Sequence, residues 1–223
     1  MSKTFTRGAV LAAAACLMAA PAIAEGEFSG SVTLTSDYVY RGFTQTDGAP
    51  MIQGSFDWAS DSFYVGTWAS GVDFGDGTST EIDLYAGWTP TVGVFDLGAI
   101  YYWYPDAPDN PEQNFIEVYA GASTTLGEFV DVGASIAYSP DFYLEVGDAL
   151  YYSGSVGIPL GEYFGLDATI GYSDFQDLSG ADYTDYSIGL TTAFKGFDFD
   201  VRYIGTDVSG NDDTVVVSVS RSL

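Results

Sequence analysis

Short segments of alternating apolar and polar residues run through most of the chain, and this alternation is the strongest constraint on its fold. In segment 94–104, for example, Phe95 and Leu97 point one way while Asp96 and Gly98 point the other. A period of two is typical of β-strands that have one apolar and one polar face. Such strands either pack as a sandwich in water or close into a barrel in a membrane, where every backbone amide must find a partner.

We predict about 12 strands, an even number such as single-chain bacterial barrels require. The predicted strands lie near 28–40, 50–59, 63–72, 80–89, 94–104, 114–125, 129–139, 147–158, 163–173, 183–193, 197–206 and 213–223. Connections after even-numbered strands are tight, as at 60–62, 161–162 and 195–196, whereas 41–49 and 105–113 are longer. Short periplasmic turns and long outer loops are usual in outer-membrane barrels, so both termini would be periplasmic.

Two further observations favour the barrel over a soluble secreted acidic β-sandwich, which is the alternative. The polar faces carry mainly Gly, Ser, Thr and Asp, with almost none of the Lys and Glu expected of a solvated sheet. Aromatic residues gather near strand ends, as interfacial girdles do: Tyr38, Tyr40, Trp88, Phe95, Tyr101 to Tyr104, Phe197 and Phe199. We therefore predict an all-β fold, a transmembrane antiparallel up-and-down β-barrel of about 12 strands.

The first residues have the features of an export signal. Lys3 and Arg7 form a basic start, an apolar run covers 9–20, and Ala22-Ile23-Ala24 offers a cleavage site. We predict a signal peptide over 1–24 and one barrel domain over 25–223. The expected location is the outer membrane, with its lipid as a partner.

The charge of the chain is strongly negative. All 31 acidic residues follow Ala24, against four basic ones, so the net charge after cleavage would be 4 − 31 = −27. Nucleic acid is excluded as a partner because no basic patch could displace counterions. Two interpretations stay open, an acidic surface adapted to a salty habitat and a pore with a negative field.

Alternation also predicts which charged side chains face the interior. The predicted pore-lining residues are Asp37, Arg41, Asp83, Asp96, Glu117, Asp131, Asp167, Asp198, Asp200 and Arg202. Carboxylate rings favour cations, so the pore would prefer them. Roughly eight strands give a filled barrel and roughly 16–18 an open channel, so about 12 predicts a narrow pore. Arg41 should pair with a carboxylate across the barrel or in a long loop, because Asp37 is about 13 Å away along one strand; a solvated rim residue is the alternative.

Catalytic chemistry is poorly supported. The chain has no histidine, which excludes Ser-His-Asp hydrolysis and imidazole-ligated metals. The acidic stretches 73–78 and 207–213 could offer oxygen ligands to calcium, but neither has an EF-hand spacing, and we interpret both as turns. We expect no enzyme activity, no metal site and no cofactor.

One stretch supports a family resemblance. Residues 36–50 read SDYVYRGFTQTDGAP, and the likeness continues through YVGTWAS at 64–70, VDF at 72–74 and YWYP at 102–105. This pattern resembles the TorF-family porins, a proteobacterial family of conserved hypothetical outer-membrane barrels. The resemblance implies an outer-membrane barrel inserted by the barrel-assembly machinery. The last residue departs from the pattern, since such barrels commonly end in Phe or Trp and this chain ends in Leu223.

Two functions follow for a barrel of this kind. The first is an outer-membrane porin-like channel for passive diffusion of small solutes, with a preference for cations. The alternative is a closed structural or adhesive barrel without transport activity.

Overall fold

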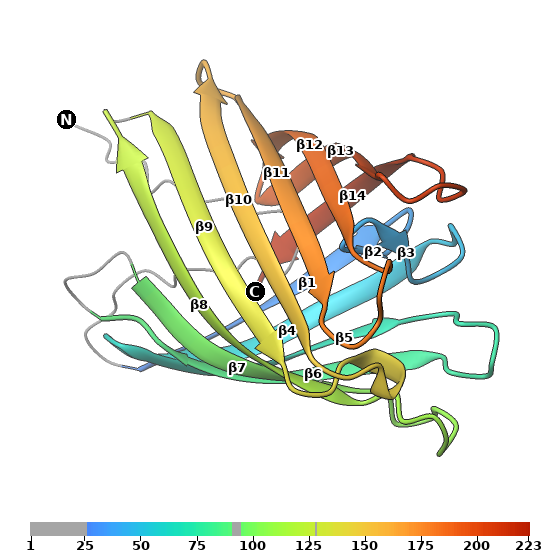
Figure 1. Cartoon of the computed structure of the whole chain (residues 1–223). Helices are drawn as coiled ribbons and strands as arrows, with labels where there is room; N and C mark the ends of the chain where they lie inside the picture. Colours follow the sequence, from blue (N-terminus) through green and yellow to red (C-terminus); the bar gives the residue numbers. More distant parts are fainter. Residues whose placement is uncertain (1–25, 91–94, 128) are drawn as a thin grey trace, which may run out of the picture.

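Twelve strands close into one barrel in which each strand is antiparallel to both neighbours (Figure 1). The computed structural model describes residues 26–90, 95–127 and 129–223, so the predicted signal peptide 1–24 lies outside the described residues. The barrel strands are β1 (Glu27–Thr35), β4 (Met51–Ala59), β5 (Phe63–Gly71), β6 (Thr80–Trp88), β7 (Phe95–Trp103), β8 (Phe115–Leu126), β9 (Val130–Ser139), β10 (Ala149–Leu160), β11 (Phe164–Phe175), β12 (Tyr183–Phe194), β13 (Phe197–Thr206) and β14 (Thr214–Ser222).

Closure is made by β1, which pairs with β14 on one side and with β4 on the other. The prediction of a 12-stranded antiparallel barrel is therefore confirmed. The β-sandwich interpretation is wrong, because one sheet closes on itself instead of two sheets packing face to face. No helix in the described residues is long and apolar enough to cross a membrane.

The two ends of the barrel differ in their connections. Tight turns join β4 to β5, β10 to β11 and β12 to β13 at one end. The long loops 36–50, 72–79, 104–114 and 140–148 lie at the other end, and the last of them contains the short 3₁₀ helix η1 (Tyr143–Glu145). Figure 1 shows these loops gathered on one side of the barrel. We call the two ends the short-turn end and the long-loop end.

The outer face of the barrel is apolar. Leu84 is 49% exposed, whereas Asp83 beside it is only 6% exposed, so the polar residue is the one that points inward. Other exposed side chains are Val32, Leu34, Ile52, Phe56, Val65, Leu97, Ile116, Val118, Val156, Ile170, Ile188, Val201, Val215 and Val217. A surface with so many exposed apolar side chains, in strands whose inner faces are polar, is a lipid-facing surface. The apolar outer face indicates that the barrel spans a membrane.

The first predicted strand, 28–40, is too long. β1 ends at Thr35, and the chain then turns into the barrel as a separate hairpin. Tyr38 is consequently buried instead of belonging to an outer girdle, and Tyr102 and Tyr104 are also buried. The girdle prediction is wrong for these residues, although the other predicted girdle aromatics on β6, β7 and β13 are exposed.

Candidate constriction of the barrel lumen

A two-stranded hairpin that follows β1 enters the lumen from the long-loop end. It consists of β2 (Val39–Tyr40) and β3 (Phe43–Thr44), which pair antiparallel. The two turn residues between them, Arg41 and Gly42, have positive φ angles of 45° and 86°. Two-residue hairpin turns of this kind favour Gly, Asn and Asp, so an arginine here is unusual. An unusual residue held in a left-handed conformation indicates a specific role for its side chain.

The hairpin reaches opposite walls of the barrel. On one side, the Tyr38 hydroxyl donates a hydrogen bond to Glu81 on β6 at 3.0 Å. On the other, the Gly42 carbonyl accepts a hydrogen bond from Asn211, which follows β13, at 3.0 Å. A side chain at Gly42 would overlap Thr206 of β13, so the turn lies directly against that strand. Only a segment that crosses the lumen can touch both walls, and the hairpin is therefore a constriction.

Arg41 at the tip of the hairpin is paired across the lumen with Glu117 of β8. Its Nη2 atom lies 2.8 Å from each carboxylate oxygen of Glu117, and both side chains are less than a tenth exposed. The guanidinium also lies 3.9 Å from the ring centroid of Tyr151, and Glu117 accepts a further hydrogen bond from Tyr102. The prediction that Arg41 pairs with a carboxylate across the barrel is confirmed. The alternative, that Arg41 is a solvated residue at the rim, is wrong.

Asp37 stabilises the hairpin from within. Its Oδ1 atom accepts hydrogen bonds from the hydroxyls of Thr44 and Thr46, each at 2.7 Å. Thr46 is fully buried and also accepts a hydrogen bond from the Tyr38 amide. The structure thus places Asp37 in the base of the hairpin, not on a barrel strand.

An aromatic cluster packs against the hairpin at the long-loop end. Tyr102 and Phe115 are stacked with their centroids 4.2 Å apart, and Tyr40 meets Tyr102 edge-on. Phe74 and Tyr143, from two long loops, pack against the same group. These rings fill one side of the lumen in the way that a small hydrophobic core fills a soluble domain.

Arg202 of β13 forms a second ion-paired centre in the lumen. It contacts Asp167 at 2.7 Å and Asp200 at 3.1 Å, and it also donates a hydrogen bond to Ser187. Arg41 and Arg202 line the same small cavity of about 20 Å³. That volume holds roughly one water molecule, so the tip of the hairpin packs closely against the wall formed by β11 to β13.

The other predicted interior residues lie along the same face. Asp83 is buried, and its Oδ1 atom has no hydrogen-bond partner among the described residues. Asp96 accepts a hydrogen bond from Tyr64. Asp131 and Asp198 lie near the short-turn end, where Asp131 is exposed and accepts a hydrogen bond from Thr125. Among the described residues, none of these four carboxylates forms a salt bridge with Arg41 or Arg202.

Three interior carboxylates were missed by the sequence prediction. Glu81 lies two residues before Asp83 and points the same way, so the alternation could have found it. Asp57 accepts a hydrogen bond from Tyr85, but the facing of its strand was ambiguous in the sequence. Asp185 accepts hydrogen bonds from Tyr151, and it alternates with Tyr186 and Ile188 on its strand, so the alternation could have found it too.

In the short-turn half, inward tyrosines lie over glycines of the neighbouring strand. Tyr64 is directly opposite Gly87, and Tyr119 is directly opposite Gly98. A Cβ atom on either glycine would overlap the tyrosine ring, which shows that the rings lie flat along the wall. The Tyr64 hydroxyl is hydrogen-bonded to Asp96 and Tyr119, so these rings form a thin polar lining.

The long loops are tied together by carboxylates at their tips. Asp76 accepts hydrogen bonds from the Thr78 amide and from Gln113, and the first of these holds the pKa of Asp76 below its usual value. Hydrogen bonds from Ser79 likewise lower the pKa of Asp106. These contacts agree with the interpretation of stretch 73–78 as a turn. In the part of the chain that the structure describes, no group of three or more acidic or cysteine side chains is arranged to hold a metal ion.

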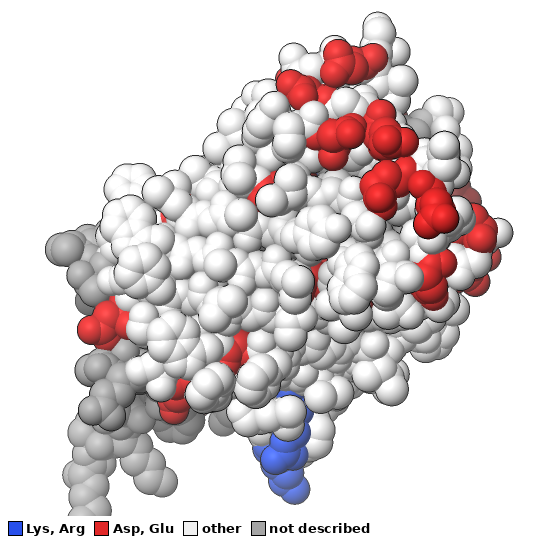
Figure 2. Space-filling model, turned by 90° about the horizontal axis from the view of Figure 1, so that it is seen from below, with Lys and Arg blue, Asp and Glu red and all other residues white. Residues whose placement is uncertain are grey.

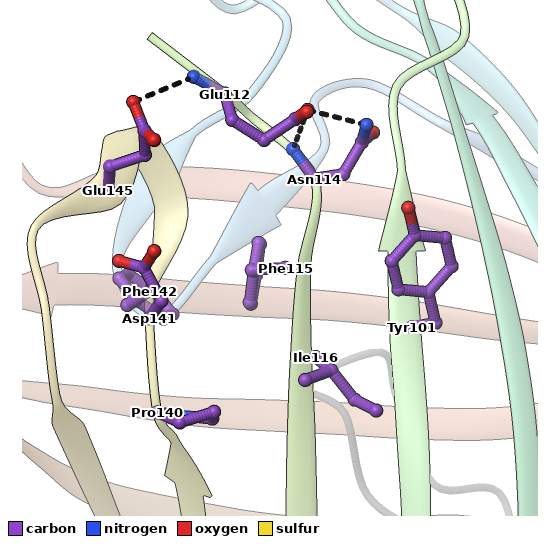
Figure 3. Close-up of a pocket in the computed structure, with 9 residues that line it drawn as sticks. All are labelled: Tyr101, Glu112, Asn114, Phe115, Ile116, Pro140, Asp141, Phe142 and Glu145. Atoms are coloured by element: carbon purple, nitrogen blue, oxygen red, sulfur yellow. Dashed lines mark hydrogen bonds between the residues drawn. The ribbon is translucent and has the colours of Figure 1, made fainter.

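A separate cleft of about 240 Å³ lies outside the lumen, between β8 and the loop that carries η1. Figure 3 shows Phe115 and Phe142 in its floor and Tyr101 and Ile116 at its side. The Glu112 carboxylate is occupied by hydrogen bonds from Asn114. The cleft thus belongs to the packing of the loops and not to the constriction.

Comparison with protein families gives one match. A family model described as a bacterial protein of unknown function (Gcw_chp) matches residues 19–222. The chain belongs to this family. No curated protein matches the sequence.

Solved structures show the same fold in outer-membrane porins. The KdgM porin is similar with a TM-score of 0.61 at 10% identity, over 87% of this chain and 99% of that one. The NanC porin gives a TM-score of 0.52 at 9% identity, over 88% and 98% of the two chains. The COG4313 outer membrane channel from Pseudomonas putida F1 gives 0.51 at 12% identity, over 90% and 96%. At these identities the likeness establishes a porin-like barrel fold.

Proposed function

We propose that this Gcw_chp-family protein is an outer-membrane channel for small solutes whose narrowest point is the hairpin that carries Arg41. The single observation that supports this proposal most strongly is the ion pair between Arg41 and Glu117 across the lumen. This ion pair holds the polar hairpin in the middle of a barrel whose outer face is apolar. A barrel that needed no passage could be filled with apolar side chains instead.

The charge of the interior supports a preference for cations. The only basic side chains found in the described interior are Arg41 and Arg202, and each is already paired with carboxylates. Asp96 and Asp131 face the same lumen without a basic partner among the described residues. Unpaired carboxylates around a narrow pore attract cations and repel anions.

The same charge argues against acidic oligosaccharides as solutes. A KdgM porin has been solved in complex with disordered oligogalacturonate, which carries many carboxylates. The interior of this chain would repel such a molecule, so the solute class of KdgM is not carried over. We propose small neutral or cationic solutes.

The closed barrel without transport is the second candidate. It is favoured by the stacked aromatic cluster and by the cavity of about 20 Å³ between Arg41 and Arg202. A closed barrel would stabilise the envelope or present its acidic loops. Neither candidate involves catalysis, and the porin-like fold is consistent with a non-enzymatic role.

Further elements of the proposal concern export. Residues 1–24 would act as the signal peptide, and the barrel-assembly machinery would insert the mature chain. The motif at 36–50 supports assignment to the TorF-family porins. Residues of this motif form the hairpin inside the lumen.

The channel and the closed barrel are separated by planar-bilayer recording of the purified protein. The channel should give small, stable conductance steps and a reversal potential in a KCl gradient that indicates cation preference. A barrel that migrates differently before and after boiling, as a folded barrel should, but conducts no ions would refute the channel. Anion preference would refute the cation assignment alone.

A further inference from the structure

Two basic side chains lie on the outer surface at the short-turn end, although the protein is strongly acidic. Arg41 and Arg202 are buried in the lumen, with side chains only 8% exposed. The other two basic residues of the described chain are Lys195, in the turn between β12 and β13, and Arg221, near the end of β14. Figure 2 shows the basic atoms of the visible face as one group, apart from the acidic side chains that crowd the long-loop end.

Each of these two basic groups lies over a phenylalanine ring. The Lys195 ammonium is 5.1 Å from the Phe194 ring centroid, and the Arg221 guanidinium carbon is 5.0 Å from that of Phe197. Phe194 and Phe197 are directly opposite each other across β12 and β13, and both rings are exposed on the outer face. Because β14 lies beside β13, the two cations and two rings occupy neighbouring positions on adjacent strands, which we call the basic rim patch.

The basic rim patch has no neutralising partner among the described residues. Neither Lys195 nor Arg221 forms a salt bridge there. The carboxylate of Asp198 belongs to the alternate set of β13, opposite to the exposed Phe197 and Phe199, and so faces the lumen. The positive charge of the patch is thus available to an external group.

Its position sets what that group can be. The patch lies at the short-turn end, at the border between the apolar outer face and water, where phospholipid phosphates lie. Lys and Arg at such a border extend their charged groups into the headgroup layer. A protein of formal net charge −25 does not attract anions in general, so binding there would depend on this local pair.

We propose that Lys195 and Arg221 bind the phosphate of an anionic phospholipid in the leaflet at the short-turn end of the barrel. Arginine can hold two phosphate oxygens through its planar fork, and lysine can contact a third as a point charge. The two phenylalanine rings would contact the acyl region just below the phosphate. The inference requires only membrane placement and does not depend on transport.

The test is native mass spectrometry of the detergent-purified barrel titrated with phosphatidylglycerol. The double variant Lys195→Gln/Arg221→Gln is compared with Ser179→Asp/Ser209→Asp, which changes the net charge equally but in long loops at the other end. We expect phosphatidylglycerol binding about thirtyfold weaker in the first variant, from roughly one kcal/mol per basic residue, and nearly unchanged in the second. Phosphatidylcholine should bind weakly to all three proteins.

Equal losses in the two variants would overturn the proposal, because net charge alone would then control binding. Displacement of the lipid by millimolar inorganic phosphate would overturn it too, because the patch would be a general anion site. Lys195→Arg/Arg221→Lys keeps both charges and should retain most of the affinity. Loss of binding in this variant, with normal heat-dependent migration on a gel, would also contradict the proposal.

Discussion

The two halves of the barrel interior use aromatic side chains differently, although Tyr151 in the long-loop half also lies over a glycine, Gly171. In the long-loop half, Tyr102 and Phe115 stand in the lumen and stack on each other, and the hairpin packs against them. In the short-turn half, Tyr64 and Tyr119 lie flat over Gly87 and Gly98 of the neighbouring strands. Aromatic rings therefore fill part of the lumen in the long-loop half, whereas in the short-turn half they lie along the wall. The difference lies in the facing residue: a glycine leaves room for a ring along the wall, and a larger side chain does not.

The largest effect should come from removal of the hairpin. Replacement of residues 38–48 by Gly-Ser-Gly leaves the twelve barrel strands intact, because β1 ends before it and β4 begins after it. Conductance in planar bilayers should rise several-fold, because the segment that crosses the lumen is gone. Unchanged conductance in a barrel that still shows heat-dependent migration would mean that the narrowest point lies in the short-turn half.

A smaller effect is expected for Arg41→Ala. Removal of one member of a buried ion pair costs about 3–5 kcal/mol, here in the docking of the hairpin rather than in the barrel strands. The variant should conduct larger, noisier currents with a stronger cation preference, because Glu117 loses its partner. Arg41→Lys should restore the charge and only part of the geometry.

The matched control is Arg41→Ala/Glu117→Gln, which removes both charges together. Its hairpin should be loose, but its selectivity should stay close to that of the unmodified protein. If Arg41→Ala and the double variant have the same reversal potential, the charge of Glu117 has no influence on permeating ions.

The short-turn half is probed by Gly87→Ala. The added methyl group must push Tyr64 away from the wall and break its hydrogen bond with Asp96. We expect lower conductance and a loss of about 1–3 kcal/mol in the free energy of unfolding by denaturant. Gly157→Ala is the control, because its Cβ would lie 3.8 Å from the nearest atom, on Asp131, which is an ordinary contact. Equal effects of the two substitutions would show that the flat tyrosine lining is unimportant.

The smallest effect concerns the loops above the aromatic cluster. The pKa values of Asp76 and Asp106 are lowered from 3.8. The stabilisation that these two carboxylates give to the loops is therefore complete above that value and is lost as the pH falls through the lowered pKa values. The hydrogen-exchange protection factors of loops 72–79 and 104–114, which correct for the intrinsic pH dependence of exchange, should fall between pH 5 and an acidic pH of roughly 2–3, while the barrel strands stay protected.

Asp76→Asn/Asp106→Asn is the control for this pH dependence. Its loops should have low protection factors at both pH values, because neither side chain carries a charge that can be lost. A pH response as large as that of the unmodified protein would assign the effect to other groups.

The sequence was sufficient to predict the barrel but not the constriction. Alternation and loop lengths specify strands, and they gave all twelve at approximately the right places. They failed at residues 36–40, which alternate as well as a barrel strand does. The relevant local signals were the Arg41–Gly42 turn and the threonines that follow Asp37.

The partner of Arg41 illustrates what local patterns leave out. Glu117 is 76 residues away, and the two side chains meet only because strand order and register place β8 beside the tip of the hairpin. Alternation could say that Glu117 faces inward, and it did. The flat tyrosines also required the register, since Tyr64 and Gly87 become neighbours only through the pairing of β5 with β6.

The central claim, a constriction in the long-loop half above a short-turn half that tyrosines only line, is tested most directly by the accessibility of a thiol. The chain has a single cysteine, Cys16, in the predicted signal peptide, so Ser155→Cys would give the mature barrel its only thiol. Ser155 belongs to the inward set of β10, four residues closer to the short-turn end than Tyr151, or about 13 Å along the strand. A bulky maleimide should label it quickly from the short-turn side and slowly from the long-loop side, and equally from both sides once the hairpin is replaced. Equal labelling from both sides with the hairpin intact would contradict the account.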